Sequence, residues 1–198
     1  MRRPLMLALL VALSALLIVT RFYPQVARTE VLGASHYSEQ EVLALAHLKR
    51  GDPLLWVTKW RSNGLVQDPW IRRARIIRHW PDTLSVAVWE REPFARFGQT
   101  VYALDGTVLP DVPKKQKETL VTLRGWGPER IDEALELLRL VAPYEPKVLS
   151  YSPSGFDIRF AESSLSTPSV ALLRAHWSGF VGQSSKQVAV YPWGVSVQ

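Results

Sequence analysis

Residues 69–96 read PWIRRARIIRHWPDTLSVAVWEREPFAR, and this stretch decides how the first half of the chain folds. Two runs with the period of a β-strand lie on either side of the Pro-Asp pair at 81–82. In the second run Leu84, Val86 and Val88 share one face, which is therefore continuously apolar. Proline presets φ for the first central position of a turn, and aspartate can hydrogen-bond its own backbone there. The stretch therefore predicts a β-hairpin.

The segment before this hairpin predicts one strand and two helices. Residues 27–32 are a short extended run that ends at Gly33. Ser38 and Glu41 have the spacing of a capping box, in which each side chain accepts a hydrogen bond from the other residue's backbone N–H, so a helix begins there. Residues 58–67 predict a second helix. With the hairpin the order becomes β-α-α-β-β, in which two helices cover one face of a three-stranded sheet.

The second half predicts an α+β arrangement, a mixed and mainly antiparallel β-domain with helices on one side. Thr167-Pro168 supplies an N-cap and a proline at the first helical position. The lysine-rich stretch 111–118 is expected to be an exposed loop. The expected strands lie in 99–109, 120–123, 148–152, 156–160, 187–190 and 194–197, and the expected helices are 128–141 and 167–177.

The N-terminal segment predicts a membrane anchor. Residues 5–20 contain no charged side chain, and 4–23 are about twenty residues, enough to cross a hydrocarbon core of roughly 30 Å as a helix. Arg2 and Arg3 favour a cytoplasmic N-terminus. A cleaved secretory signal is the alternative, but the run lacks a small-x-small exit. We expect a cytoplasmic tail over residues 1–3, a single transmembrane helix over 4–23, and the rest of the chain outside the cytoplasm.

The hairpin sequence also resembles a known family. The pattern P-W-I-x-x-A-x-I-x-R-x-W-P-D-T-L-x-V-x-V-x-E-R-E-P-x-A, followed by YALD at 102–105, is similar to the FtsQ/DivIB family of bacterial cell-division proteins. The resemblance is specific over residues 69–109 and covers the rest of the chain in layout. It implies a POTRA domain over residues 27–95 and a β-domain over residues 96–198.

The same resemblance implies a function. It predicts a non-catalytic bitopic scaffold of the division machinery in the cell (inner) membrane, with the bulk of the chain extracytoplasmic or periplasmic. Such a protein links early and late septal proteins by binding single-pass partners of the FtsB/DivIC and FtsL type. In the family, a strand near the C-terminus with the pattern D-L-R-Y-x-x-G-x-x-V helps to receive a strand from the FtsB/DivIC-type partner.

Tyr191, Gly194 and Val197 fit that pattern, whereas Val188 and Val190 replace its acidic and basic residues. An edge strand offers unpaired backbone groups to an incoming chain, so pairing can survive a change of side chains. An alternative is that the two aromatic residues of the segment only close the domain core. The expected partner-binding residues are Tyr191, Trp193, Gly194, Val195 and Val197.

Several other functions are disfavoured by what the sequence lacks. There is no cysteine, the four histidines show no metal-ligand spacing, and no nucleophile-elbow or P-loop pattern occurs. Glu90 and Glu92 could in principle form an acid/base pair, but their neighbouring arginines make ion pairing the simpler explanation. The net charge of +6 comes without a nucleic-acid-binding motif. We therefore expect no enzymatic activity, cofactor, metal, small-molecule substrate or nucleic-acid partner.

Two rival functions remain open at this point. A POTRA-containing protein of outer-membrane assembly or secretion would continue into a long transmembrane barrel, which the sequence up to Gln198 does not contain. An extracytoplasmic glycan-binding protein could use some of the eight tryptophans as a platform, although we expect most of them to pack in the core.

Overall fold

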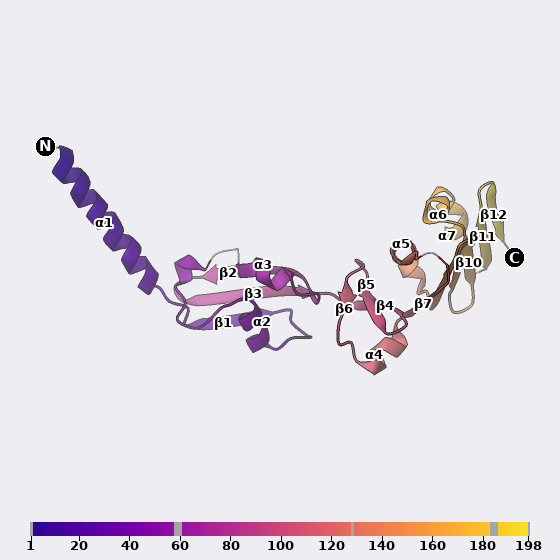
Figure 1. Ribbon diagram of the computed structural model, residues 1–198, viewed down its shortest axis with the longest axis horizontal. Helices are drawn as coiled ribbons and strands as arrows, with labels where there is room; N and C mark the ends of the chain where they lie inside the picture. The colour runs from indigo at the N-terminus through magenta and orange to yellow at the C-terminus, as the bar shows by residue number, and fades with distance from the viewer. Residues whose placement is uncertain (1, 58–60, 128, 183–185, 198) are drawn as a thin grey trace. The chain divides into compact units, whose positions relative to one another are not determined.

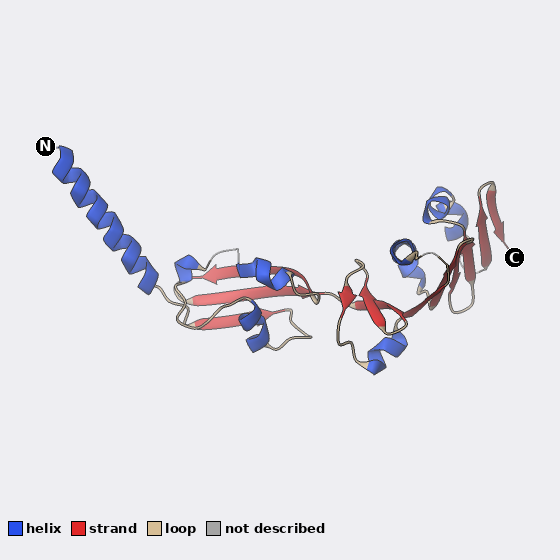
Figure 2. Ribbon diagram, viewed as in Figure 1, coloured by secondary structure: helices blue, strands red, loops and turns tan. Residues whose placement is uncertain are grey.

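The computed structural model describes residues 2–57, 61–127, 129–182 and 186–197 (Figure 1). The chain divides into two compact units, Met1–Arg91 and Glu92–Gln198. Within the described residues, the first unit holds a three-stranded sheet and the second a nine-stranded sheet (Figure 2). Residues 92–95, which we assigned to the POTRA domain from the sequence, lie in the second unit because β4 (Pro93–Phe97) pairs within the larger sheet.

The first unit has the β-α-α-β-β order that the sequence predicts. Its central strand β3 pairs in parallel with β1 and antiparallel with β2, so the sheet order is β1-β3-β2. The N-terminal half of the expected second helix falls partly on residues 58–60, which lie outside the described ranges. The elements after the N-terminal helix are β1 (Arg28–Leu32), α2 (Glu39–Leu45), the 3₁₀ turn η1 (Leu54–Trp56), α3 (Arg61–Val66), β2 (Ile71–His79) and β3 (Thr83–Glu90).

The apolar face of β3 forms the centre of the first core, as its period predicts. Leu84, Val86 and Val88 are buried beneath the helices, together with Val42 of α2. The capping box is formed, since the Ser38 N–H donates to Glu41 Oε2 at 2.8 Å and the Glu41 N–H donates to Ser38 Oγ at 3.4 Å. Capping therefore places the start of α2 correctly, and periodicity places the buried face of the central strand.

Glu90, at the end of β3, fastens the loop between β1 and α2. Its Oε2 accepts hydrogen bonds from the Ser35 N–H, the Ser35 hydroxyl and the His36 N–H at 3.0, 2.6 and 2.8 Å, and its Oε1 accepts one from the Tyr37 N–H at 3.4 Å. Together these donors satisfy both oxygens of the carboxylate. Burial works to raise the pKa of Glu90, but the four hydrogen bonds outweigh it and the pKa is lowered.

The N-terminal helix α1 spans Arg2–Phe22, and its side chains are described for Met6 and residues 8–22. In the part of the chain whose side chains are described, no helix combines the length and the apolar character needed to cross a membrane. The transmembrane helix that we expected over residues 4–23 is therefore not confirmed.

The second unit is a mixed, mainly antiparallel sheet with strand order β12-β11-β10-β9-β8-β7-β4-β5-β6. Three of its pairings are parallel (β4 with β7, β7 with β8 and β10 with β11) and the other pairings are antiparallel. Its further elements are β5 (Thr100–Ala103), β6 (Val108–Leu109), α4 (Lys114–Thr119), β7 (Val121–Gly125), α5 (Ile131–Val141), the 3₁₀ turn η2 (Ala142–Tyr144), β8 (Val148–Ser152), β9 (Gly155–Arg159), β10 (Ser164–Thr167), α6 (Val170–Ala175), α7 (Trp177–Val181), β11 (Gln187–Tyr191) and β12 (Gly194–Val197).

The expectation of helices on one side holds for α5, α6 and α7, whose apolar residues join the main core of the second unit. Helix α4, which we expected to be a loop, lies on the other side of the sheet (Figure 2). Successive side chains of β5 point to opposite faces of the sheet, so both faces carry apolar residues there. Tyr102 packs against the main core, while Val101 is buried on the other face, outside that core. The expected N-cap at Thr167 is also wrong, since Thr167 ends β10 and the hydroxyl of Ser169 caps α6.

We expect the Glu90 contacts to stabilise the first unit only while the carboxylate is ionised. The pKa of Glu90 is lowered on folding, so its contribution is complete above the unfolded value of about 4.3 and is lost as the pH falls through the folded value. Glu90→Gln should destabilise the fragment 24–198 by about 1–2 kcal/mol at neutral pH, and by progressively less in acid. Urea unfolding followed by tryptophan fluorescence measures this.

The control for this prediction is Glu162→Gln, a change at an exposed carboxylate of the second unit, which should have little effect at neutral pH. An equal effect of Glu90→Gln at acidic and neutral pH would contradict the proposed role of the ionised carboxylate.

Candidate partner-binding site

The last two strands form a hairpin at one edge of the nine-stranded sheet. Strand β12 folds back on β11 through the two-residue turn at 192–193, and Tyr191 and Gly194 are the pair that closes the turn. No other described strand pairs with β12, which is the first in the sheet order. An antiparallel edge strand directs about half of its N–H and C=O groups away from its only neighbour, so these groups can pair with an incoming strand.

The hairpin is anchored to the core of the second unit through one face. Val188 and Val190 of β11 are buried, and Val195 of β12 packs against the same core. A Cβ added to Gly179 of α7 would lie only 2.9 Å from Val195 Cγ2, so glycine is what lets β12 approach this helix. The two valines that replace the family's acidic and basic residues are thus structural, and neither offers a polar contact to a partner.

Tyr191 and Trp193 lie on either side of Pro192 with their rings stacked on each other. The ring centroids are 5.1 Å apart and the ring planes are within 8° of parallel. Tyr191 is 40% exposed and Trp193 is 82% exposed. The alternative that the two aromatics close the core is therefore wrong, because both rings face outward.

An open pocket of about 220 Å³ adjoins Tyr191 and is lined by β9, β10 and β11. Two residues of its lining are hydrogen-bonded: the Ser166 hydroxyl donates to Asp157 Oδ1, which links the two neighbouring strands through their side chains. Gly155 forms one wall at a φ of +148°, and a Cβ there would lie 2.6 Å from the carbonyl oxygen of Thr167. The close approach of the strands at this pocket therefore depends on a glycine.

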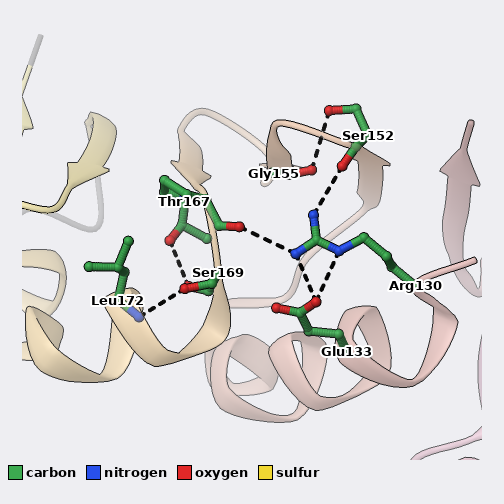
Figure 3. Close-up of polar contacts among 8 residues, drawn as sticks. Arg130, Glu133, Ser152, Gly155, Thr167, Ser169 and Leu172 are labelled. Atoms are coloured by element: carbon green, nitrogen blue, oxygen red, sulfur yellow. Dashed lines mark hydrogen bonds and ion pairs between the residues drawn. The ribbon is translucent and has the colours of Figure 1, made fainter. Parts of the chain in front are cut away.

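The wall of this pocket is tied to α5 by Arg130, the residue before that helix (Figure 3). Its guanidinium donates to the carbonyl oxygens of Ser152 and Pro168 at 3.0 and 3.3 Å, and it pairs with Glu133 Oε2 at 2.7 Å. It also lies 4.2 Å from the centroid of the Phe156 ring. One side chain thus connects the β8–β9 turn, the start of α6 and the start of α5.

The structure brings all five sequence-predicted site residues together in the β11–β12 hairpin. Val195 faces the core more than the solvent, while Val197 is 36% exposed near the end of β12. Sequence reasoning missed both the pocket beside Tyr191 and the role of Arg130. Neither feature leaves a local pattern in the sequence. Apart from the nearby Glu133, the partners of Arg130 lie 22 and 38 residues away.

Comparisons with known proteins find similarity to one family. The POTRA domain family of the FtsQ type matches residues 25–91. The chain is 28% identical to the cell division protein FtsQ of Zymomonas mobilis subsp. mobilis over 154 residues, which is 72% of this chain and 48% of that protein. It is 35% identical to FtsQ of Hahella chejuensis over 101 residues, covering 47% of this chain and 34% of that protein. A third relative, FtsQ of Xanthomonas campestris pv. campestris, is 30% identical over 101 residues, with 51% and 34% covered.

Residues 25–91 match a POTRA domain of the FtsQ type, and the chain is similar to proteins of the FtsQ/DivIB family. The family resemblance of the hairpin at 69–96 is thereby confirmed, and the matched POTRA domain, residues 25–91, lies within the first compact unit. The aligned regions span about a third to a half of the length of these FtsQ relatives. The binding partners of full-length FtsQ/DivIB proteins are therefore only proposed for this chain.

We expect Arg130→Ala to destabilise the second unit by about 2–3 kcal/mol. Arg130 is 20% exposed, and its removal leaves two carbonyl oxygens without this donor and Glu133 without its ion pair. Arg174→Ala is the matched control, because its ion pair with Glu136 joins side chains that are 57% and 41% exposed. The control should cost less than about 1 kcal/mol. Equal losses of unfolding free energy for the two variants, in urea unfolding of the fragment 24–198, would show that the Arg130 contacts stabilise the second unit no more than an exposed ion pair does.

Proposed function

We propose that this chain is a non-catalytic, bitopic scaffold of the bacterial division machinery, which binds single-pass partners of the FtsB/DivIC and FtsL type outside the membrane. The FtsQ-type POTRA domain and the similarity to FtsQ proteins support a role in cell division. The observation that carries the partner-binding part is the β11–β12 hairpin, which combines an open strand edge with two stacked, exposed aromatic rings.

The hairpin suits the addition of a partner strand alongside β12. Main-chain hydrogen bonds to an edge strand supply affinity, and adjacent side-chain contacts supply specificity. Tyr191 and Trp193 provide large apolar surface with few rotatable bonds, as residues that dominate binding energy commonly do. Because Val188 and Val190 are held in the core, an incoming strand can add to the edge without rearrangement of the hairpin.

The proposal includes a membrane anchor at the N-terminus, over residues 4–23, in the cell (inner) membrane. Four successive residues of α1, Leu16–Val19, are 52–61% exposed, and at 100° per residue they point in four directions around the helix. A helix that is apolar on all sides requires an apolar environment. Arg2 and Arg3 favour a cytoplasmic N-terminus, which leaves both compact units extracytoplasmic.

A non-catalytic role is proposed because the carboxylate that the sequence offers for acid/base chemistry is already engaged. Glu90 accepts three backbone N–H groups and one hydroxyl from residues 35–37, an arrangement that holds it ionised and fixed. Such a carboxylate fastens a loop, and it is poorly placed to exchange a proton with a substrate.

The test is the affinity of the fragment 24–198 for the outer segment of the FtsB/DivIC-type protein from the same organism. Tyr191→Ala with Trp193→Ala should raise the Kd at least about 10-fold, since each ring contributes exposed aromatic surface at the proposed contact. Isothermal titration calorimetry measures the Kd, and circular dichroism establishes that the variant remains folded.

Trp126→Ala is the matched control, because Trp126 is a 70% exposed tryptophan of the same unit outside the hairpin. Its Kd should equal that of the unchanged protein. If the double variant is folded and binds with unchanged affinity, the partner site lies elsewhere on the molecule.

A further inference from the structure

One end of the first unit gathers the segment that follows α1, the 3₁₀ turn η1 and the turn between β2 and β3. The Leu54 N–H donates to the carbonyl oxygen of Pro24 at 2.9 Å, and the Ala27 N–H donates to that of Asp82 at 2.8 Å. Arg78 Nη1 donates to the carbonyl oxygen of Leu55 at 3.2 Å. We call this region, residues 22–28, 52–56 and 78–83, the α1-proximal end.

Exposed aromatic side chains are concentrated at the α1-proximal end. Phe22 and Tyr23 are 66% and 73% exposed, Trp56 is 45% exposed, and Trp80, at the tip of the hairpin, is 67% exposed. They come from three separate segments, so no single helix or strand pattern accounts for them. Because burial of a tryptophan side chain is strongly favourable, this much exposed aromatic surface indicates that something apolar covers it.

Arginine side chains accompany these aromatic residues, two at the α1-proximal end and one, Arg21, directly before it. Arg28 and Arg78 are exposed, and the guanidinium of Arg21 lies 5.9 Å from the ring centroid of Trp56. The acidic residues of this end have local partners: Asp52 accepts from the Lys49 N–H at 3.2 Å, and Asp82 from the Thr83 hydroxyl at 3.1 Å. Tryptophan and tyrosine together with arginine are the side chains typical of the boundary between lipid and water.

We infer that the α1-proximal end of the POTRA domain docks on the bilayer surface, with Trp56 and Trp80 at the level of the lipid headgroups. The bilayer is what covers this end, because the proposed anchor α1 holds the two together. Pro24, two residues after α1, is hydrogen-bonded to the α1-proximal end. The inference rests on the proposed membrane anchor. Docking of this end would limit the rotation of the POTRA domain about the anchor, beyond what a simple tether allows.

The test uses the full chain in nanodiscs of phosphatidylcholine and phosphatidylglycerol. The chain has no cysteine, so a single introduced cysteine can carry an environment-sensitive fluorophore. The probe site is His79→Cys, and the matched control site is Arg72→Cys, because both residues are exposed and lie near opposite ends of β2. Seven residues of strand separate the two sites by about 23 Å.

A phosphatidylcholine that carries a spin label near the headgroup end of its acyl chain quenches the fluorophore at short range. We expect at least about threefold more quenching at 79 than at 72. Adding Trp80→Ala should reduce the quenching at 79 by at least about half, and adding Trp56→Ala as well should lower it to the level at 72. Both tryptophans are exposed, so their removal should leave the fold intact.

The possible failures are distinguishable. If the full chain does not co-elute with the nanodiscs, the proposed anchor is wrong and the docking falls with it. If the chain co-elutes and sites 72 and 79 are quenched equally, the anchor stands and the docking is overturned. Strong quenching at 79 that persists in the tryptophan variants would also overturn it, since the tether alone would then hold this end near the lipid.

Discussion

Two buried valines determine what the C-terminal hairpin can do. Val188 and Val190 hold β11 to the core of the second unit, and Val195 brings β12 against α7. Side chains alternate along a strand, so fixing these residues inward fixes which backbone edge of the hairpin remains open. With these residues fixed inward, the rings of Tyr191 and Trp193 at the turn face outward. The binding surface proposed for this protein is thus a consequence of packing on the other face.

The first unit illustrates what a sequence determines locally. The period of Leu84, Val86 and Val88 predicted the buried face of β3, and the capping box predicted the start of α2. Both signals act between residues a few positions apart, which is why they can be recognised without a structure. The role of Glu90 could not be recognised in this way, because its donors lie more than fifty residues away, in the loop after β1.

The second unit shows where local signals were insufficient. Thr167-Pro168 has the composition of a helix start, yet Thr167 is a strand residue because it pairs with Phe156 of β9. Likewise, the exposed polar residues of 114–119 carry no helical period, and α4 was expected to be a loop. The five site residues were found together because they are contiguous, while Arg130 joins segments distant in sequence and left no pattern to find.

The central claim is that a partner strand pairs with β12, and hydrogen exchange tests this most directly. The amide N–H groups of Gly194–Val197 would be followed in the full chain, with and without the outer segment of the FtsB/DivIC-type partner. Binding should slow exchange in β12, because N–H groups that face solvent become donors to the added strand. Unchanged exchange in β12 under saturating partner, with protection appearing in another segment, would contradict it.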